Sequence, residues 1–132
     1  MAELEAGDAI PELDVTPDKY LPHRYAGASG DFNPIHIDPE FAEAVGLPQN
    51  ILHGLYTMAI VARGCAGLAE GDPRALKRLA VQFRGMGLPE AEIKVTGTVI
   101  AVDGNRVTVD VVAEQNGKRI IRNAEAEVEL GD

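Results

Sequence analysis

The spacing of apolar and polar positions predicts an antiparallel β-sheet in the last third of the chain. Apolar and polar residues alternate there with the period of strands that bury one face. These strands cover residues 92–99, 107–111 and 123–130. Asp103-Gly104-Asn105 and Asn116-Gly117 separate them and are typical of hairpin turns, since Asn and Gly tolerate positive φ. With a further strand over Leu79–Arg84, they form a meander whose apolar face requires cover.

The segment from Gly54 to about Ala69 is expected to provide that cover as a buried helix. It is apolar almost all round, which is typical of a helix enclosed by other elements. Gly64 and Gly67 lower its helix propensity, but they also allow another backbone to approach closely. The expected fold class is therefore α+β, with an antiparallel sheet wrapped around one central helix.

Two shorter helices are expected before this one. Asp38 is a typical N-cap, Pro39 suits the first helical position, and Gly46 with Pro48 ends the helix. Thr16-Pro17-Asp18 is a plausible helix start leading towards Ala28. The remaining N-terminal part is expected to be irregular.

The candidate chemistry lies between these two short helices, over residues 29–36. Ser29, Asp31, Asn33 and His36 place four polar groups within eight residues. On one helix Asp31 and His36 would lie about 140° apart. Pro34 excludes a continuous helix because it disfavours the α conformation at Asn33. A turned loop can instead bring the carboxylate and the imidazole together, where they could bind and deprotonate a water molecule.

These residues also allow other interpretations. Asp-x-Asn-Pro is a common turn, and His36 could be a structural histidine. Asp31, His36, Asp38 and His53 are residue types that bind metals. However, the chain has no His-x-x-x-His pair and no paired cysteines, so no metal site is expected.

Composition limits the classes of partner. The 132 residues correspond to one domain, residues 1–132. The formal net charge of −9 argues against nucleic acid binding, which requires clustered Lys and Arg. No apolar run is long enough to span a membrane, and the acidic first residues do not suit a leader. The single Cys65 cannot form an internal disulfide and is expected to be buried and reduced, which favours the cytoplasm.

One part of the chain departs from this acidic character. Basic residues gather in one stretch: Arg74, Lys77, Arg78, Arg84 and Lys94. Such a patch could hold a phosphorylated ligand, or it could be an ordinary solvated surface.

The segment from Tyr25 to His36 resembles the signature of a known family. It reads Tyr-Ala-Gly-Ala-Ser-Gly-Asp-Phe-Asn-Pro-Ile-His and is similar to that of the MaoC-like, or (R)-specific, enoyl-CoA hydratases (hydratase 2). His53-Gly54 resembles the second landmark of the family, and Leu52 departs from the small residue often found before it. The resemblance implies a hot-dog fold and the reversible hydration of trans-2-enoyl thioesters to (3R)-3-hydroxyacyl thioesters.

The resemblance also implies residue roles. Asp31 and His36 would activate water, and the Gly54 N–H would bind the thioester oxygen, a role that a helix N-terminus also favours. His53 is expected to be structural. The expected substrate-binding residues are Ser29, Asn33, Leu52 and Tyr56. The expected phosphate contacts are Arg74, Arg78 and Arg84.

The resemblance implies no metal or redox cofactor. Coenzyme A or acyl carrier protein would arrive as the carrier of the substrate. Hot-dog domains usually pair, so a homodimer is expected, with a heterodimer of related subunits as the alternative. Two other functions remain open for this fold: an acyl-CoA thioesterase, and a non-catalytic acyl-binding or structural subunit.

Overall fold

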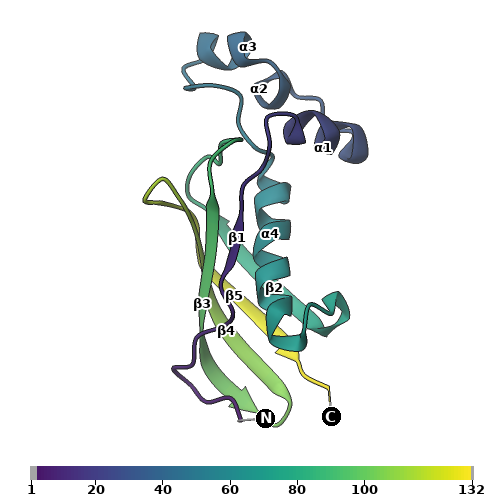
Figure 1. The fold of residues 1–132 in the computed structure, drawn as a ribbon, viewed down its shortest axis with the longest axis vertical. Coiled ribbons are helices and arrows are strands. Elements are labelled where there is room, and N and C mark those ends of the chain that lie inside the picture. Colours follow the sequence, from purple (N-terminus) through teal and green to yellow (C-terminus); the bar gives the residue numbers. More distant parts are fainter. Residues whose placement is uncertain (1–2, 132) are drawn as a thin grey trace.

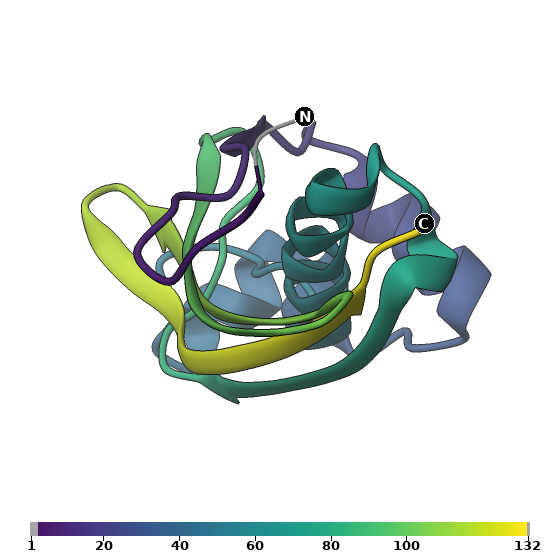
Figure 2. The same ribbon diagram turned by 90° about the horizontal axis from the view of Figure 1, so that it is seen from below.

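A curved antiparallel sheet surrounds one helix in the computed structural model, which describes residues 3–131. The five strands follow the order β1-β3-β4-β5-β2. They are β1 (Leu13–Val15), β2 (Leu76–Phe83), β3 (Ile93–Asp103), β4 (Arg106–Gln115) and β5 (Lys118–Glu129). Helix α4 (Gly54–Ala66) lies along the concave face (Figure 1), and Figure 2 shows the sheet curving around it. The architecture expected from the sequence is confirmed.

The two predicted hairpins are also confirmed. Asp103 pairs with Arg106, so Gly104 and Asn105 form a two-residue turn between β3 and β4. Between β4 and β5, the turn consists of Asn116 and Gly117, whose φ angles are +53° and +74°. Two consecutive positive φ angles match the twist of a tight hairpin, which explains why Asn and Gly occupy this turn.

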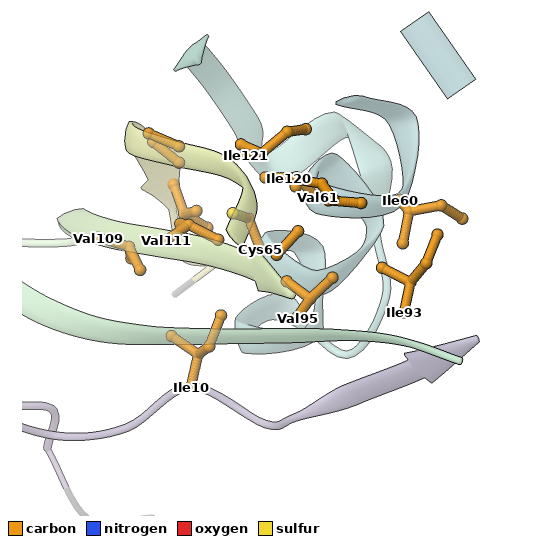
Figure 3. Close-up of a cluster of buried hydrophobic side chains, with 14 of the residues drawn as sticks. Ile10, Ile60, Val61, Cys65, Ile93, Val95, Val109, Val111, Ile120 and Ile121 are labelled. Atoms are coloured by element: carbon orange, nitrogen blue, oxygen red, sulfur yellow. The ribbon is translucent and has the colours of Figure 1, made fainter. Parts of the chain in front are cut away.

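The core lies between α4 and the concave face of the sheet. Alternate residues of β4, such as Val109 and Val111, are fully buried. Figure 3 shows Val61 and Cys65 of α4 facing Val95 and Val111 of the strands. Burial raises the pKa of the Cys65 thiol to about 11, so the thiol is protonated at neutral pH. Cys65 is therefore the buried thiol that the sequence predicts.

Gly64 is needed where α4 meets β3. A Cβ atom at this position would lie 2.8 Å from Val95 Cγ1. Real Cβ atoms do not approach other atoms so closely, and an alanine would force the helix away from the sheet. The glycine lowers helix propensity and in return lets the two elements pack directly.

Three short helices lie beyond the N-terminal end of α4 (Figure 1). They are α1 (Leu21–Ser29), α2 (Pro34–Ile37) and α3 (Pro39–Ala44). Asp38 caps α3 as predicted, because its Oδ1 accepts hydrogen bonds from the N–H groups of Glu40 and Phe41. Two 3₁₀ turns, η1 (Gly67–Ala69) and η2 (Pro73–Ala75), connect α4 to β2.

The N-terminal part differs from the prediction in two respects. Helix α1 begins at Leu21 and not near Thr16, because the Asp18 side chain accepts a hydrogen bond from the Tyr20 N–H and forms a separate turn. Residues expected to be irregular form β1, which pairs with the edge of β3 through Leu13 and Val95. Within the described residues, no helix has both the length and the apolar character to cross a membrane.

Candidate active site

The conformation of the loop between α1 and α2 is set by hydrogen bonds between its polar side chains and backbone N–H groups. Helix α1 ends at Gly30, whose φ of +80° turns the chain out of the helix. The Asp31 N–H donates to Ser29 Oγ at 3.2 Å, and the Asn33 N–H donates to Asp31 Oδ1 at 3.2 Å. Asn33 Oδ1 then accepts from the Ile35 N–H and caps α2. The loop is therefore ordered by local hydrogen bonds although its residues are exposed.

The loop brings Asp31 and His36 together. Asp31 Oδ2 lies 3.8 Å from His36 Nε2. This distance is too long for a direct hydrogen bond, but it allows one water molecule to reach both groups. The convergence predicted from the sequence is confirmed, even though His36 lies on the one-turn helix α2, which the sequence did not reveal.

The orientation of His36 follows from its other ring nitrogen. His36 Nδ1 lies 2.9 Å from the carbonyl oxygen of Ile51. A carbonyl oxygen only accepts, so Nδ1 carries the hydrogen. In the neutral imidazole this leaves a lone pair on Nε2, on the side of Asp31. The His36 ring is thereby fixed with its acceptor nitrogen towards the carboxylate.

A cavity of about 330 Å³ lies beside this pair at the N-terminal end of α4. Its lining residues are Tyr25, Ser29, Asp31, His53, Gly54, Leu55 and Phe83. Gly54 is the first residue of α4, and the N–H groups of a first helical turn have no intrahelical acceptor and carry partial positive charge. His36 is 9% exposed and is not among the lining residues, but its Nε2 lies 3.8 Å from Oδ2 of the lining residue Asp31. The cavity therefore brings the Asp31 carboxyl group close to the backbone N–H groups at the N-terminus of α4.

His53 belongs to this site, although the sequence suggested only a structural role. Its Nε2 lies 3.0 Å from the carbonyl oxygen of Asp31, and its ring stacks on His36 with centroids 4.0 Å apart. The contact with Asp31 spans 22 positions along the chain. No local pattern predicts such a contact; the sequence indicated His53 only through the resemblance of His53-Gly54 to the second landmark of the family.

The site also has residues of metal-binding type. Asp31, His36 and His53 each offer one ligand atom, and these atoms lie within 4.8 Å of one another. However, His36 Nδ1 and His53 Nε2 each lie at hydrogen-bonding distance from a backbone carbonyl oxygen. Asp38, the other acidic candidate, caps α3 instead. These hydrogen bonds occupy one nitrogen of each histidine and leave the lone pair of the other nitrogen free to interact with a water molecule or another ligand.

Comparison with known proteins gives the family. The profile of the family described as "MaoC like domain" matches residues 5–124. The chain belongs to the MaoC-like family. The enoyl-CoA hydratase ChsH3 of Mycobacterium tuberculosis is 31% identical over 122 residues, which cover 92% of this chain and 41% of that protein. The chain spans between 5% and 41% of the length of three curated relatives that it matches.

Solved structures give the same fold for this MaoC-like chain. A structure titled "MaoC-like dehydratase" is 31% identical, has a TM-score of 0.88, and is matched over 98% of this chain and 41% of that one. The (R)-hydratase of A. caviae involved in PHA biosynthesis is 22% identical with a TM-score of 0.87, over 99% of this chain and 100% of that one. The hot-dog fold is therefore shown.

Of the four residues expected to bind substrate, only Ser29 lines the cavity of the MaoC-like chain. The Asn33 side chain caps α2, and Leu52 is 3% exposed within the core. Tyr56 packs edge-on against Tyr25, and burial raises the pKa of its hydroxyl. The structure thus places Asn33, Leu52 and Tyr56 next to the site but not among the residues that line the cavity.

The three arginines expected to bind phosphate do not line this cavity either. Arg74 pairs with Asp72 at 3.0 Å and lines a separate cavity of about 690 Å³, together with Leu68 and Ala69 beyond the other end of α4. Arg78 Nη1 lies 3.8 Å from Glu125 Oε1. Arg84 Nη2 donates a hydrogen bond to Gln82 Oε1 at 2.7 Å. None of these three arginines therefore lines the cavity within this chain, although Arg84 directly follows the lining residue Phe83.

Proposed function

We propose that this MaoC-like chain adds water to trans-2-enoyl thioesters to give (3R)-3-hydroxyacyl thioesters, and catalyses the reverse dehydration. One observation carries the proposal: Asp31 Oδ2 and His36 Nε2 lie 3.8 Å apart beside a cavity that Gly54, the first residue of α4, also lines. The relative ChsH3 is an enoyl-CoA hydratase, which supports the same reaction.

The water would be activated by two acceptors. It donates one hydrogen to the Asp31 carboxylate and the other to His36 Nε2, which leaves an oxygen lone pair for the β-carbon. Asp31 takes a proton as the new C–O bond forms, and the electrons of the double bond move onto the thioester oxygen. A proton from the Asp31–His36 pair is then delivered to the α-carbon as the enolate collapses, which completes the addition of one water molecule.

The developing enolate needs a hydrogen-bond donor. The Gly54 N–H supplies it at the positive end of α4, and glycine lets the oxygen approach without a Cβ atom in the way. One preorganised donor of this kind is worth roughly 3–4 kcal/mol of transition-state stabilisation.

The proposed chemistry requires no metal or redox cofactor. The substrate is an acyl thioester carried by coenzyme A or acyl carrier protein. Nucleic acid is not a proposed partner, because the net charge is −9. A reducing compartment such as the cytoplasm suits the single buried thiol of Cys65.

Incubation with crotonyl-CoA tests the reaction. We expect the absorbance of the conjugated enoyl thioester to fall with no release of free thiol, and the product to be the (3R) enantiomer. Release of free thiol in step with the loss of absorbance would instead identify a thioesterase. If neither change occurs, alone or with a related subunit present, the chain is a non-catalytic subunit or acyl-binding module, and hydration is rejected.

The assembly that we propose is a homodimer. Within the described residues β2 is an edge strand, and the apolar side chains of Leu55 and Phe83 are exposed beside the cavity. Pairing with a second copy would cover such an edge. Light scattering of the purified chain should therefore give twice the mass of one chain. A monomeric mass, with activity only after a related subunit is added, would favour the heterodimer.

A further inference from the structure

We infer that His53 is a positioning residue that holds both Asp31 and His36 in their reactive arrangement. This inference rests on the proposed hydration, because it concerns the same site. His53 is 2% exposed, directly precedes Gly54, and contacts side chains or backbone from three other segments of the site. It does so through an N–H group at one edge and through contacts of its ring with the rings of His36 and Tyr25.

The N–H group ties down the loop that carries Asp31. His53 Nε2 lies 3.0 Å from the Asp31 carbonyl oxygen, and the N–H donates because a carbonyl only accepts. Among the described residues, every other hydrogen bond of Asp31 is made within its own loop, to Ser29 and Asn33. The Asp31 side chain is 53% exposed. The His53 hydrogen bond is therefore what fixes Asp31 relative to the N-terminus of α4.

The His53 ring helps to hold the His36 ring in place. The His36 and His53 rings are stacked, with centroids 4.0 Å apart and planes 22° from parallel. Tyr25 packs against His53 at a centroid distance of 4.7 Å. His36 is thus held by the stacked ring and by its own hydrogen bond to Ile51, which together set the direction of Nε2.

The two stacked rings carry their hydrogens on opposite nitrogens. His53 has its hydrogen on Nε2, and its Nδ1 is buried with no hydrogen-bond partner among the described residues. His36 has its hydrogen on Nδ1. A second hydrogen on His53 would point from Nδ1 into a place without an acceptor and would put a charge against the His36 ring. The geometry therefore fits a neutral His53 that supports, and does not replace, the proton-transferring pair.

Two substitutions separate the hydrogen bond from the packing. His53→Phe keeps a flat ring for the stack but removes the N–H, whereas His53→Gln keeps an amide N–H near the Nε2 position but removes the ring. His53→Phe should be the more stable variant, since it retains the packing and removes the unpartnered Nδ1. His53→Gln should be the more active one, since it retains the hydrogen bond to Asp31 and since the hydrogen bond to the Ile51 carbonyl still orients the His36 ring when the stacked ring is lost.

The measurement is kcat and KM for crotonyl-CoA, together with the unfolding midpoint of each variant. We expect His53→Phe to lose about 10- to 100-fold in kcat with KM changed less than about twofold, because small displacements of a catalytic group have effects of this size. His53→Gln should stay within about fivefold of the wild-type kcat. His53→Gln is then the more active variant, and His53→Phe is the more stable one. If His53→Phe is as active as His53→Gln or more active, packing alone explains the residue and the inference fails.

A spectrum of the wild-type protein tests the inference without any variant. The chain has three histidines, so long-range ¹H–¹⁵N correlations of the imidazoles can be assigned fully. His53 should carry a hydrogen on Nε2, as donation to the Asp31 carbonyl requires. A His53 ring without a hydrogen on Nε2 overturns the inference. An inactive wild-type protein with the expected His53 spectrum would instead reject the hydratase function and leave the His53 contacts in place.

Discussion

Replacing Asp31 with asparagine should lower kcat/KM for crotonyl-CoA by about 10²- to 10⁴-fold, the usual contribution of a general base. Asparagine keeps the size of the side chain and an oxygen that can accept the Asn33 N–H, so the loop should keep its winding. What it loses is the charge and basicity of the oxygen that lies 3.8 Å from His36 Nε2. Steady-state kinetics on Asp31→Asn, with circular dichroism to verify folding, measures this effect.

Asp110→Asn is the matched control. Asp110 is an exposed residue of β4, a strand that contributes no lining residue to the cavity, so the same change there should leave kcat/KM within about twofold of the wild type. If Asp31→Asn were as active as the Asp110→Asn control, Asp31 would not be the general base.

A double variant tests whether Asp31 and His36 act on one water molecule. In His36→Asn the amide nitrogen can replace Nδ1 as the donor to the Ile51 carbonyl, while the nitrogen corresponding to Nε2 is lost. Groups that act as a unit show strongly non-additive losses. Asp31→Asn combined with His36→Asn should therefore be little slower than the slower single variant. Losses that multiply would mean that the two groups act on separate steps.

The parts of the fold that the sequence predicts are those set by local patterns. The strands that form β3, β4 and β5 follow a period of two, and their turns contain residues that adopt positive φ. The cap at Asp38 and the buried helix at Gly54 are equally local signals. For the site, Pro34 and the polar spacing of the loop showed that Asp31 and His36 could converge, and the family resemblance predicted that they do.

The features that were missed depend on contacts between distant segments. Strand β1 has three residues and forms because the edge of β3 offers unpaired backbone groups, which its own sequence does not reveal. His53 joins the site through a contact 22 positions away. Arg74 and Arg78 form a basic stretch in the sequence, but in space they lie beside carboxylates. Sequence spacing gives the residue types of a site, whereas tertiary packing selects which of them meet.

The second large effect is expected at Gly54. Gly54→Pro removes the N–H proposed to bind the enolate oxygen, and kcat should fall about 10²- to 10³-fold, as for the loss of one oxyanion donor. The helix should tolerate this change. Gly54 occupies the first helical position, where proline is favoured and the N–H has no intrahelical acceptor. His53 already has the extended backbone (φ −63°, ψ 136°) that a residue before proline adopts.

Gly54→Ala separates the loss of the N–H from the added bulk. Its Cβ would lie 3.3 Å from Phe83 Cε1, and the half-exposed Phe83 ring can move by the small amount needed. Alanine keeps the N–H, so Gly54→Ala should retain kcat within about tenfold of the wild type, and Gly54→Pro should fall at least tenfold below Gly54→Ala. Equal kcat values in the two variants would show that crowding against Phe83 causes the loss, and that the enolate oxygen is stabilised elsewhere than at the Gly54 N–H.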